Sequence, residues 1–109
     1  LELRARRHDR AAVERACFDA NANVRFYARR YLRKLGVAVD LRGQALARLR
    51  APDGGDIVAA LGVLSELGRA EDTPTIAPFA AHPRAAVARE ARRTLELLGA
   101  LSAPRGSLE

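Results

Sequence analysis

Several residue types that usually carry chemistry are scarce in this sequence. It has no Met or Trp, one cysteine (Cys17) and two histidines (His8 and His82). A single cysteine forms no disulfide within the chain and supplies too few thiolates for a cysteine-based metal site. Lone histidines rarely make a catalytic or metal centre without further ligands beside them. We therefore expect a protein with no cofactor, no bound metal and no enzymatic activity.

Long apolar runs are missing as well. No stretch approaches the roughly 18 apolar residues that a membrane-spanning helix needs, and no signal-peptide pattern opens the sequence. We expect a cytoplasmic protein without a membrane partner. The sequence starts at Leu1 rather than Met, and its last residues, Leu108 and Glu109, resemble a cloning scar. We therefore interpret it as a fragment of a longer protein.

Aromatic residues make up only 5% of the sequence, whereas apolar residues total 49% and are mainly Ala, Leu and Val. Small aliphatic side chains let helices approach closely, so this composition favours packed helices over a β-sandwich. The net charge is +6, and 18 of the 19 basic residues are Arg. A positive balance suits an acidic protein, a nucleic acid or a membrane surface, but a biased base composition of the genome explains it more simply.

An internal repeat organises the sequence. Three segments end alike, with YLRKLG at 31–36, VLSELG at 63–68 and TLELLG at 94–99, so the glycines are 32 and then 31 residues apart. This period is typical of solenoids that are built from helix pairs. Residues before each Leu-Gly continue the agreement and predict an amphipathic helix in every repeat.

The apolar stripe of each predicted second helix has helical spacing. In the first repeat it consists of Val24, Ala28, Tyr31, Leu32 and Leu35. The third repeat has, at the same offsets, Val87, Ala91, Thr94, Leu95 and Leu98. The second repeat matches with Ala60, Val63, Leu64 and Leu67. Because such helices are too short to be stable alone, neighbouring pairs must bury these stripes against each other.

A shorter helix precedes each of these, and its start carries a recognisable signal. Asp9 and Asp40 are predicted N-caps, and Thr73 followed by Pro74 is a strong helix start over 73–81. Pro78 lies inside that short helix and is expected to weaken or kink it.

Glycines are predicted to end the second helices. Gly36, Gly68 and Gly99 follow the last apolar residue of each repeat, where a left-handed C-cap favours glycine. Turns of Asn, Asp, Pro or Gly at 19–23, 51–56 and 81–84 separate the paired helices.

The pattern resembles the HEAT repeat, in particular the short bacterial HEAT-like repeats of the phycobilisome-lyase type. In that family an Asp-Pro turn joins the helices, Val-Arg opens the second helix, and Leu-Gly ends it. Residues 67–99 carry the pattern best, with Pro83 at the turn, and the first repeat has Asp19 and Val-Arg at 24–25. The sequence departs from the pattern at four positions, Ala20, Asp56, His82 and Ala88.

This resemblance and the repeat predict an all-α protein, an α-solenoid of about three antiparallel helix pairs. We expect residues 1–8 to be the frayed end of a preceding helix and 100–109 a flexible tail. The three repeats are predicted at 9–36, 37–68 and 69–99. HEAT repeats serve scaffolds, transport factors, lyases, DNA-binding enzymes and a metal-dependent hydroxylase, so the resemblance implies an architecture rather than one function.

The residues that could carry chemistry have simpler interpretations. Cys17 is expected to pack as a small apolar residue, and His82 to cap or line a turn. HEAT-like hydroxylases hold iron with His-Glu pairs, and this sequence has none. Acidic residues cluster at predicted helix starts and turns, where capping explains them.

Basic residues on the second helices form the one candidate binding surface. Residues 9–36 hold seven basic and three acidic side chains, whereas residues 37–68 hold three and four. The resemblance implies that second helices line the concave face of the solenoid. The candidate binding residues are Arg25, Arg29, Arg30, Arg33, Arg89, Arg92 and Arg93.

Three functions stay open for this surface. The first is a non-catalytic scaffold that binds an acidic protein partner or other domains of its parent chain. The second is a nucleic-acid-binding solenoid, similar to the HEAT-like alkylpurine DNA glycosylases, whose arginines contact phosphates. The third is an accessory part of a lyase-like HEAT enzyme. The oligomeric state stays open too, and a charged helix face is also commonly no more than a solvated surface.

Overall fold

The computed structural model describes the backbone of residues 6–102 and the side chains of residues 10–99. Residues 1–5 and 103–109, which hold most of the expected frayed end and flexible tail, lie outside this range. The described residues form helices and no strand, so the all-α prediction is confirmed. They divide into two compact units: unit 1 ends at Leu41, and unit 2 begins at Arg42.

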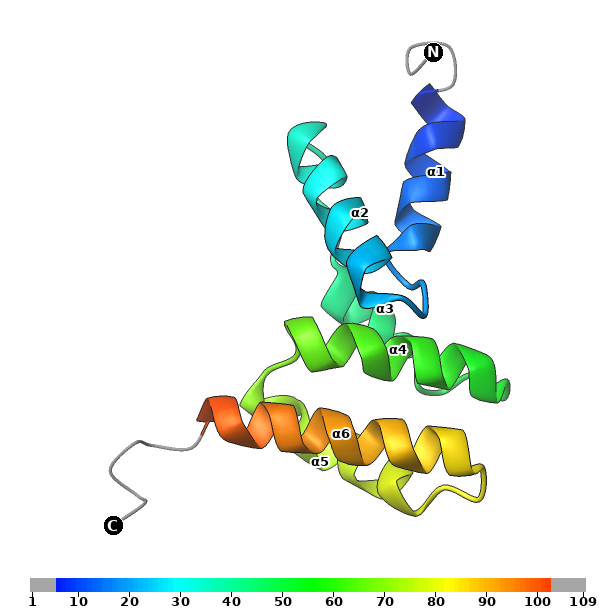
Figure 1. Cartoon of the computed structure of the whole chain (residues 1–109), viewed down its shortest axis with the longest axis vertical. Coiled ribbons are helices and arrows are strands. Elements are labelled where there is room, and N and C mark those ends of the chain that lie inside the picture. The colour runs from blue at the N-terminus through cyan, green and yellow to red at the C-terminus, as the bar shows by residue number, and fades with distance from the viewer. Residues whose placement is uncertain (1–5, 103–109) are drawn as a thin grey trace. The chain divides into compact units, whose positions relative to one another are not determined.

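Unit 1 contains two helices that run in opposite directions. α1 (Arg6–Ala16) and α2 (Ala22–Lys34) pack against each other and diverge from the turn that joins them (Figure 1). The Asn21 side chain caps α2 by accepting hydrogen bonds from the backbone N–H groups of Asn23 (2.8 Å) and Val24 (3.4 Å). Asn at this position satisfies N–H groups that have no partner within the helix, which fixes where α2 begins.

The C-terminus of α2 shows why the sequence needs glycine there. Gly36 has φ of 73°, a left-handed conformation that favours glycine. Its N–H donates to the Arg33 carbonyl, and the Val37 N–H donates to the Leu32 carbonyl, both at 3.0 Å. This is the paired hydrogen-bond pattern of a Schellman motif, so the predicted left-handed cap at Gly36 is confirmed.

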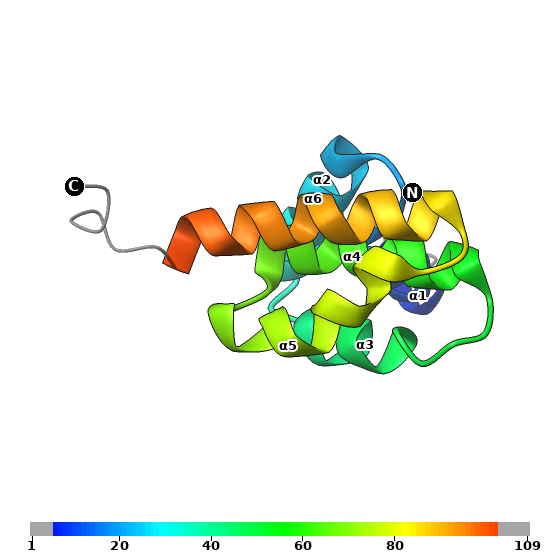
Figure 2. The same cartoon turned by 90° about the horizontal axis from the view of Figure 1, so that it is seen from below.

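Unit 2 is built around two long helices. α4 (Gly54–Leu67) and α6 (Ala85–Ser102) lie side by side and run in the same direction (Figures 1 and 2). The Thr94 hydroxyl lies 3.0 Å from the Leu61 carbonyl oxygen, and Leu98 packs at Gly68. Both contacts join residues about one repeat period apart, so the equivalent parts of two consecutive repeats meet.

α4 is buried around its whole circumference. The six consecutive residues from 60 to 65 are all buried. A helix that is apolar on all faces belongs in a protein interior. The one polar side chain in this stretch, Ser65, donates its hydroxyl hydrogen bond to the Gly62 carbonyl at 2.6 Å and so has a partner. The predicted stripe residues Ala60, Val63 and Leu64 are confirmed as core.

The segment before α6 is divided into short helical pieces, unlike the single helix that was predicted over 73–81. It consists of the 3-10 turn η1 (Ala70–Asp72), α5 (Thr73–Ile76) and the 3-10 helix η2 (Ala77–Ala81). Pro74 stands in the first turn of α5, as predicted. The α-helical pattern ends just before Pro78, because proline lacks the N–H that would continue it and crowds the preceding turn. A single α-helix over 73–81 is therefore wrong.

α3 (Leu41–Arg48) begins directly after Asp40, at the predicted place. Its apolar side is buried at Leu41, Ala45 and Leu49. An ion pair between Arg42 of α3 and Asp72 of η1 joins the two segments.

Other boundaries differ from the prediction. Asp9 lies inside α1, because the helix already includes Arg6, so an N-cap at Asp9 is wrong. Residues 100–102 continue α6, and Gly99 lies within the helix rather than at its end. Gly68 ends α4, but with φ of −70° and ψ of 170° it is extended rather than left-handed. Glycine is needed there for another reason, since a Cβ would meet the Leu64 carbonyl oxygen at 2.5 Å.

Candidate functional site

Arg25 is a structural residue of unit 1 and not part of an exposed face. Its side chain is buried, with 4% of the residue exposed. The guanidinium donates hydrogen bonds to the carbonyl oxygens of Asp19 (2.7 Å) and Ala20 (3.2 Å) in the turn before α2. These bonds satisfy carbonyls in the tight connection between the helices. The prediction that Arg25 presents its charge to a partner is therefore wrong.

The remaining basic residues of α2 point outward to different degrees. Arg30, Arg33 and Lys34 are exposed, and Arg29 is half-buried. Arg30, Arg33 and Lys34 form no ion pair with an acidic residue in the part of the chain that the structure describes. Uncompensated cations on a helix surface attract anionic partners at low and moderate salt. These three residues form the α2 basic face.

The basic residues of α6 are partly committed to local contacts. Arg92 donates to the Ala80 carbonyl at 3.0 Å, and Arg93 pairs with Glu90 at 3.1 Å. Arg89 is exposed. At the offset of Arg25 relative to the Leu-Gly, the later segment has Ala88, and the carbonyl that Arg92 contacts belongs to η2. The arginines of α2 and α6 belong to different units, and we treat them as two separate surfaces.

A groove in unit 1 was not predicted from the sequence. It has a volume of about 560 Å³, is open to solvent, and lies between α1 and α2. Its lining is apolar except at one end, where two asparagines stand: Ala12, Val13, Ala16, Asn21, Asn23, Val24, Tyr27, Ala28 and Tyr31. Val24 and Leu35, which the sequence assigned to a buried stripe, are 38% and 44% exposed. The one sequence feature that could have indicated the groove is the group of aromatic residues Phe26, Tyr27 and Tyr31. These three residues spread over more of the helix surface than a single buried stripe occupies.

The exposed aromatic residues beside the groove are ordered by a ring contact. Phe26 and Tyr27 are 47% and 63% exposed. Their ring centroids lie 5.3 Å apart at an angle of 77°, the favourable edge-to-face geometry. A pair of large exposed rings on one helix is typical of a contact surface.

Cys17 and His82 have structural surroundings. Cys17 is buried in the turn after α1, and burial raises the pKa of its thiol, against the opposing effect of the Arg29 charge. A thiol with a raised pKa is a poor nucleophile, which agrees with the prediction of a packing role. His82 accepts a hydrogen bond at Nδ1 from the Arg84 backbone N–H (3.0 Å) and stacks on Phe79. It is therefore a turn residue, as predicted.

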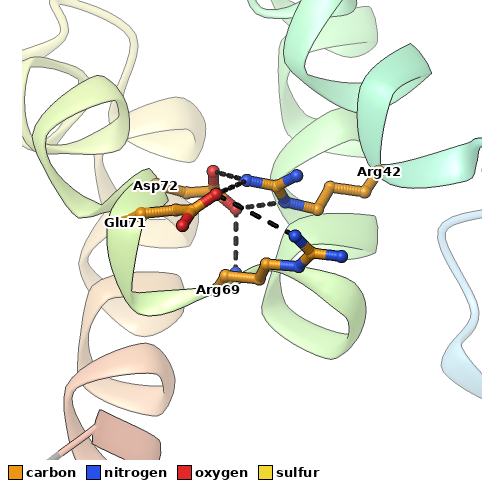
Figure 3. A network of polar contacts seen from close by, with 4 residues as sticks. All are labelled: Arg42, Arg69, Glu71 and Asp72. Atoms are coloured by element: carbon orange, nitrogen blue, oxygen red, sulfur yellow. Dashed lines mark hydrogen bonds and ion pairs between the residues drawn. The ribbon is translucent and has the colours of Figure 1, made fainter.

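The strongest polar cluster of unit 2 joins α3 to η1 (Figure 3). The Arg42 guanidinium binds both carboxylate oxygens of buried Asp72, with Nε 2.8 Å from Oδ2, and also contacts Glu71 at 3.0 Å. Asp72 Oδ2 further accepts from the Arg69 backbone N–H at 2.8 Å. The hydrogen bond from Arg42 is the main reason that the pKa of Asp72 is lowered below its usual 3.8.

This cluster has a structural role, because every charged oxygen that it buries has a donor. A two-fold Arg–carboxylate contact fixes both distance and orientation. No sequence signal pointed to it, since Arg42 and Asp72 are 30 residues apart.

Among the described residues, no three His, Cys, Asp or Glu side chains gather in a way that could hold a metal ion. Within the same part of the chain, no helix is both long and apolar enough to cross a membrane. Comparison of the chain with protein-family models, with curated proteins and with solved structures finds no match. Function must therefore be argued from the surfaces themselves.

Proposed function

We propose that this chain is a non-catalytic helical-repeat module that binds another protein. The observation that carries the proposal is the surface of unit 1, where the groove and the exposed aromatic pair stand beside the α2 basic face. A surface that combines apolar anchors with arginines is typical of protein interfaces. Nucleic-acid surfaces, by contrast, are dominated by cations that contact phosphates.

We also propose that the helices form a HEAT-like solenoid of about three pairs. The repeat period of 31 and 32 residues supports it. So does the parallel alignment of α4 and α6, in which residues one repeat apart contact each other. In a solenoid each repeat buries its apolar stripe against the next, and this alignment produces that contact.

The proposal is tested by reversing charge on one surface at a time in this chain. The first variant combines Arg30→Glu, Arg33→Glu and Lys34→Glu. The second, a matched control, combines Arg50→Glu, Arg69→Glu and Arg84→Glu at exposed positions of unit 2 that are not candidate binding residues. We expect the first variant to lose protein partners that co-purify with the wild type, and the control to keep them. Retention of every partner by both variants would contradict the proposal.

A salt titration separates protein binding from nucleic-acid binding. Labelled single- and double-stranded DNA and RNA are titrated with the chain at about 50 and 200 mM salt, and fluorescence anisotropy is recorded. Phosphate contacts release counterions, so nucleic-acid binding falls steeply over this range. We expect no micromolar binding at either salt concentration. Tight binding at 50 mM that collapses at 200 mM would replace the proposal with the nucleic-acid function.

A further inference from the structure

We propose that the groove between α1 and α2 binds an amphipathic helix whose apolar face is flanked by acidic residues. This inference rests on the proposed protein-binding function and specifies its partner. It is drawn from the shape of the groove, the side chains that line it and the charges along its edges.

The shape of the groove suits a helix better than a small molecule. It is open to solvent rather than enclosed, whereas small-ligand pockets usually bury most of their ligand. Its α1 side is formed by Ala12, Val13 and Ala16, which are small and leave room for a backbone to approach. An apolar helix face that lies in an apolar groove is a common mode of peptide recognition.

The α2 side of the groove supplies the anchor surface. Val24, Tyr27 and Tyr31 stand three and four residues apart, so they share one face of the helix. Tyr27 is 63% exposed, and its ring makes an edge-to-face contact with that of Phe26, which does not line the groove. Covering this ring removes apolar surface from water, which is the main favourable contribution to association.

Basic residues stand along both edges of the groove. Arg15 follows Ala12 by three residues on α1, and Arg30 and Lys34 follow Tyr27 and Tyr31 by three residues on α2, so each neighbours a lining residue. All three are exposed, and none pairs with an acidic residue within the described part of the chain. Acidic residues beside the apolar face of a bound helix would meet these cations. This complementarity selects the partner and speeds its association.

The same charges argue against a second copy of this chain as the occupant. Residues 10–40 carry seven basic and three acidic side chains, a net charge of +4. A copy bound by the same face would bring like charges together, which is unfavourable. A nucleic acid would satisfy the cations but offers no aliphatic side chains to fill the groove between them.

The test uses three synthetic helical peptides and the chain as it stands. The first peptide has Leu at positions i, i+3, i+4 and i+7 with Glu on both flanks. The second has Lys in place of Glu, and the third has Ala in place of Leu. Binding is measured by isothermal titration calorimetry and by anisotropy of labelled peptide. We expect the Glu peptide to bind at least about tenfold more tightly than either of the others.

Two variants, with one control, test whether the Glu peptide binds in the groove. Tyr27→Ala removes an exposed ring of the groove and should weaken the Glu peptide about tenfold. Its matched control is Leu97→Ala, which removes a 39% exposed apolar side chain from unit 2 and should leave the affinity unchanged. The pair Arg30→Glu and Lys34→Glu should reverse the preference between the Glu and Lys peptides. Circular dichroism of each variant checks that it remains folded.

The outcomes separate this inference from the proposed function. If the Glu and Lys peptides bind equally, or if Tyr27→Ala has no effect, the inference is wrong. It is also wrong if sedimentation shows a dimer that Tyr27→Ala dissociates, since a second copy then occupies the groove. If the chain still loses its partners through Arg30→Glu, Arg33→Glu and Lys34→Glu, the proposed function stands without this inference.

Discussion

The two units place their apolar side chains differently. In unit 2, α4 is buried on every side, and Thr94 of α6 is also fully buried against it. In unit 1, α2 and its C-terminal cap leave four large apolar residues at the surface with between 38% and 63% exposed: Val24, Phe26, Tyr27 and Leu35. The two units share one repeat pattern, so the repeat itself does not produce this difference.

The difference shows that a stripe of apolar residues becomes core only where a second surface covers it. In unit 2, α6 supplies that surface, because it lies along α4. In unit 1 the same kind of stripe borders the open groove. An apolar surface of this kind marks a place where something else can bind.

The largest expected effect lies in the core of unit 2. Leu64→Ala removes a fully buried side chain from α4 and leaves a cavity. We expect the free energy of unfolding to fall by about 3 kcal/mol in urea denaturation followed by circular dichroism. Leu97→Ala, at a 39% exposed site on α6, should cost less than about 1 kcal/mol. Equal effects would show that the burial of α4 does not decide how much its side chains stabilise unit 2.

The next effect concerns Asp72 and depends on pH. Its lowered folded-state pKa means that the carboxylate stabilises the fold at pH values above its unfolded pKa of about 3.8, and that this stabilisation is lost as the pH falls through the folded pKa. Asp72→Asn should cost about 2 kcal/mol at pH 7, and the difference from wild type should shrink below about pH 4. Unfolding free energies measured between pH 7 and 2 check both parts.

The matched control for this pH profile is Glu71→Gln. Glu71 contacts the same Arg42 guanidinium, but its side chain is 68% exposed. Exposed ion pairs contribute little, so this variant should keep the acid-dependent loss of stability. A Glu71→Gln profile as flat as that of Asp72→Asn would assign the effect to the whole cluster.

A smaller effect is expected in unit 1. Arg25→Ala removes the donor that binds the Asp19 and Ala20 carbonyls, so the turn before α2 should open more readily. We expect a loss of about 1.5 kcal/mol and faster amide exchange at the start of α2. Arg30→Ala, on the exposed face of the same helix, should stay within about 0.5 kcal/mol of wild type. A larger loss of stability for Arg30→Ala than for Arg25→Ala would contradict the structural role of Arg25.

The smallest effect tests the contact between α4 and α6. Thr94→Val keeps the shape of the side chain but removes the hydroxyl that lies 3.0 Å from the Leu61 carbonyl oxygen. The same hydroxyl lies 2.8 Å from the Glu90 carbonyl oxygen. Because both carbonyls belong to helices, we expect a cost of only about 1 kcal/mol by thermal denaturation. Thr75→Val, at an exposed position, is the control and should have no measurable effect.

Local signals predicted the elements whose causes are local. The left-handed Gly36 and the Pro78 interruption each depend on a few neighbouring residues, and the structure has them where the sequence placed them. The turn between α1 and α2 overlaps the predicted 19–23 but lies at 17–21, because Asn21 caps α2 and the helix begins at Ala22. Gly68 and Gly99 have the same sequence context as Gly36 but different conformations. The backbone conformation of Gly68 is set by its close approach to the Leu64 carbonyl and the Leu98 side chain. At Gly99 the helix does not end, because α6 continues through it.

The candidate site was predicted less well than the helices. Periodicity identifies which residues are off the apolar stripe, but not which of them find partners. Arg25 and Arg30 both lie off the stripe, yet only Arg25 is buried on the carbonyls of a turn. The groove depends on how far α1 and α2 diverge, and no pattern in the sequence records that distance.

The sequence by itself determined that this protein is helical and where most of its helices lie. Helical periodicity, capping residues and proline act within a few residues of the chain, so composition and spacing are sufficient to read them. Only the tertiary structure decided which arginines are structural, which carboxylate is buried beneath Arg42 and which apolar stripe stays open. Those outcomes depend on contacts between residues that are distant in the sequence, and such contacts form only when the helices pack.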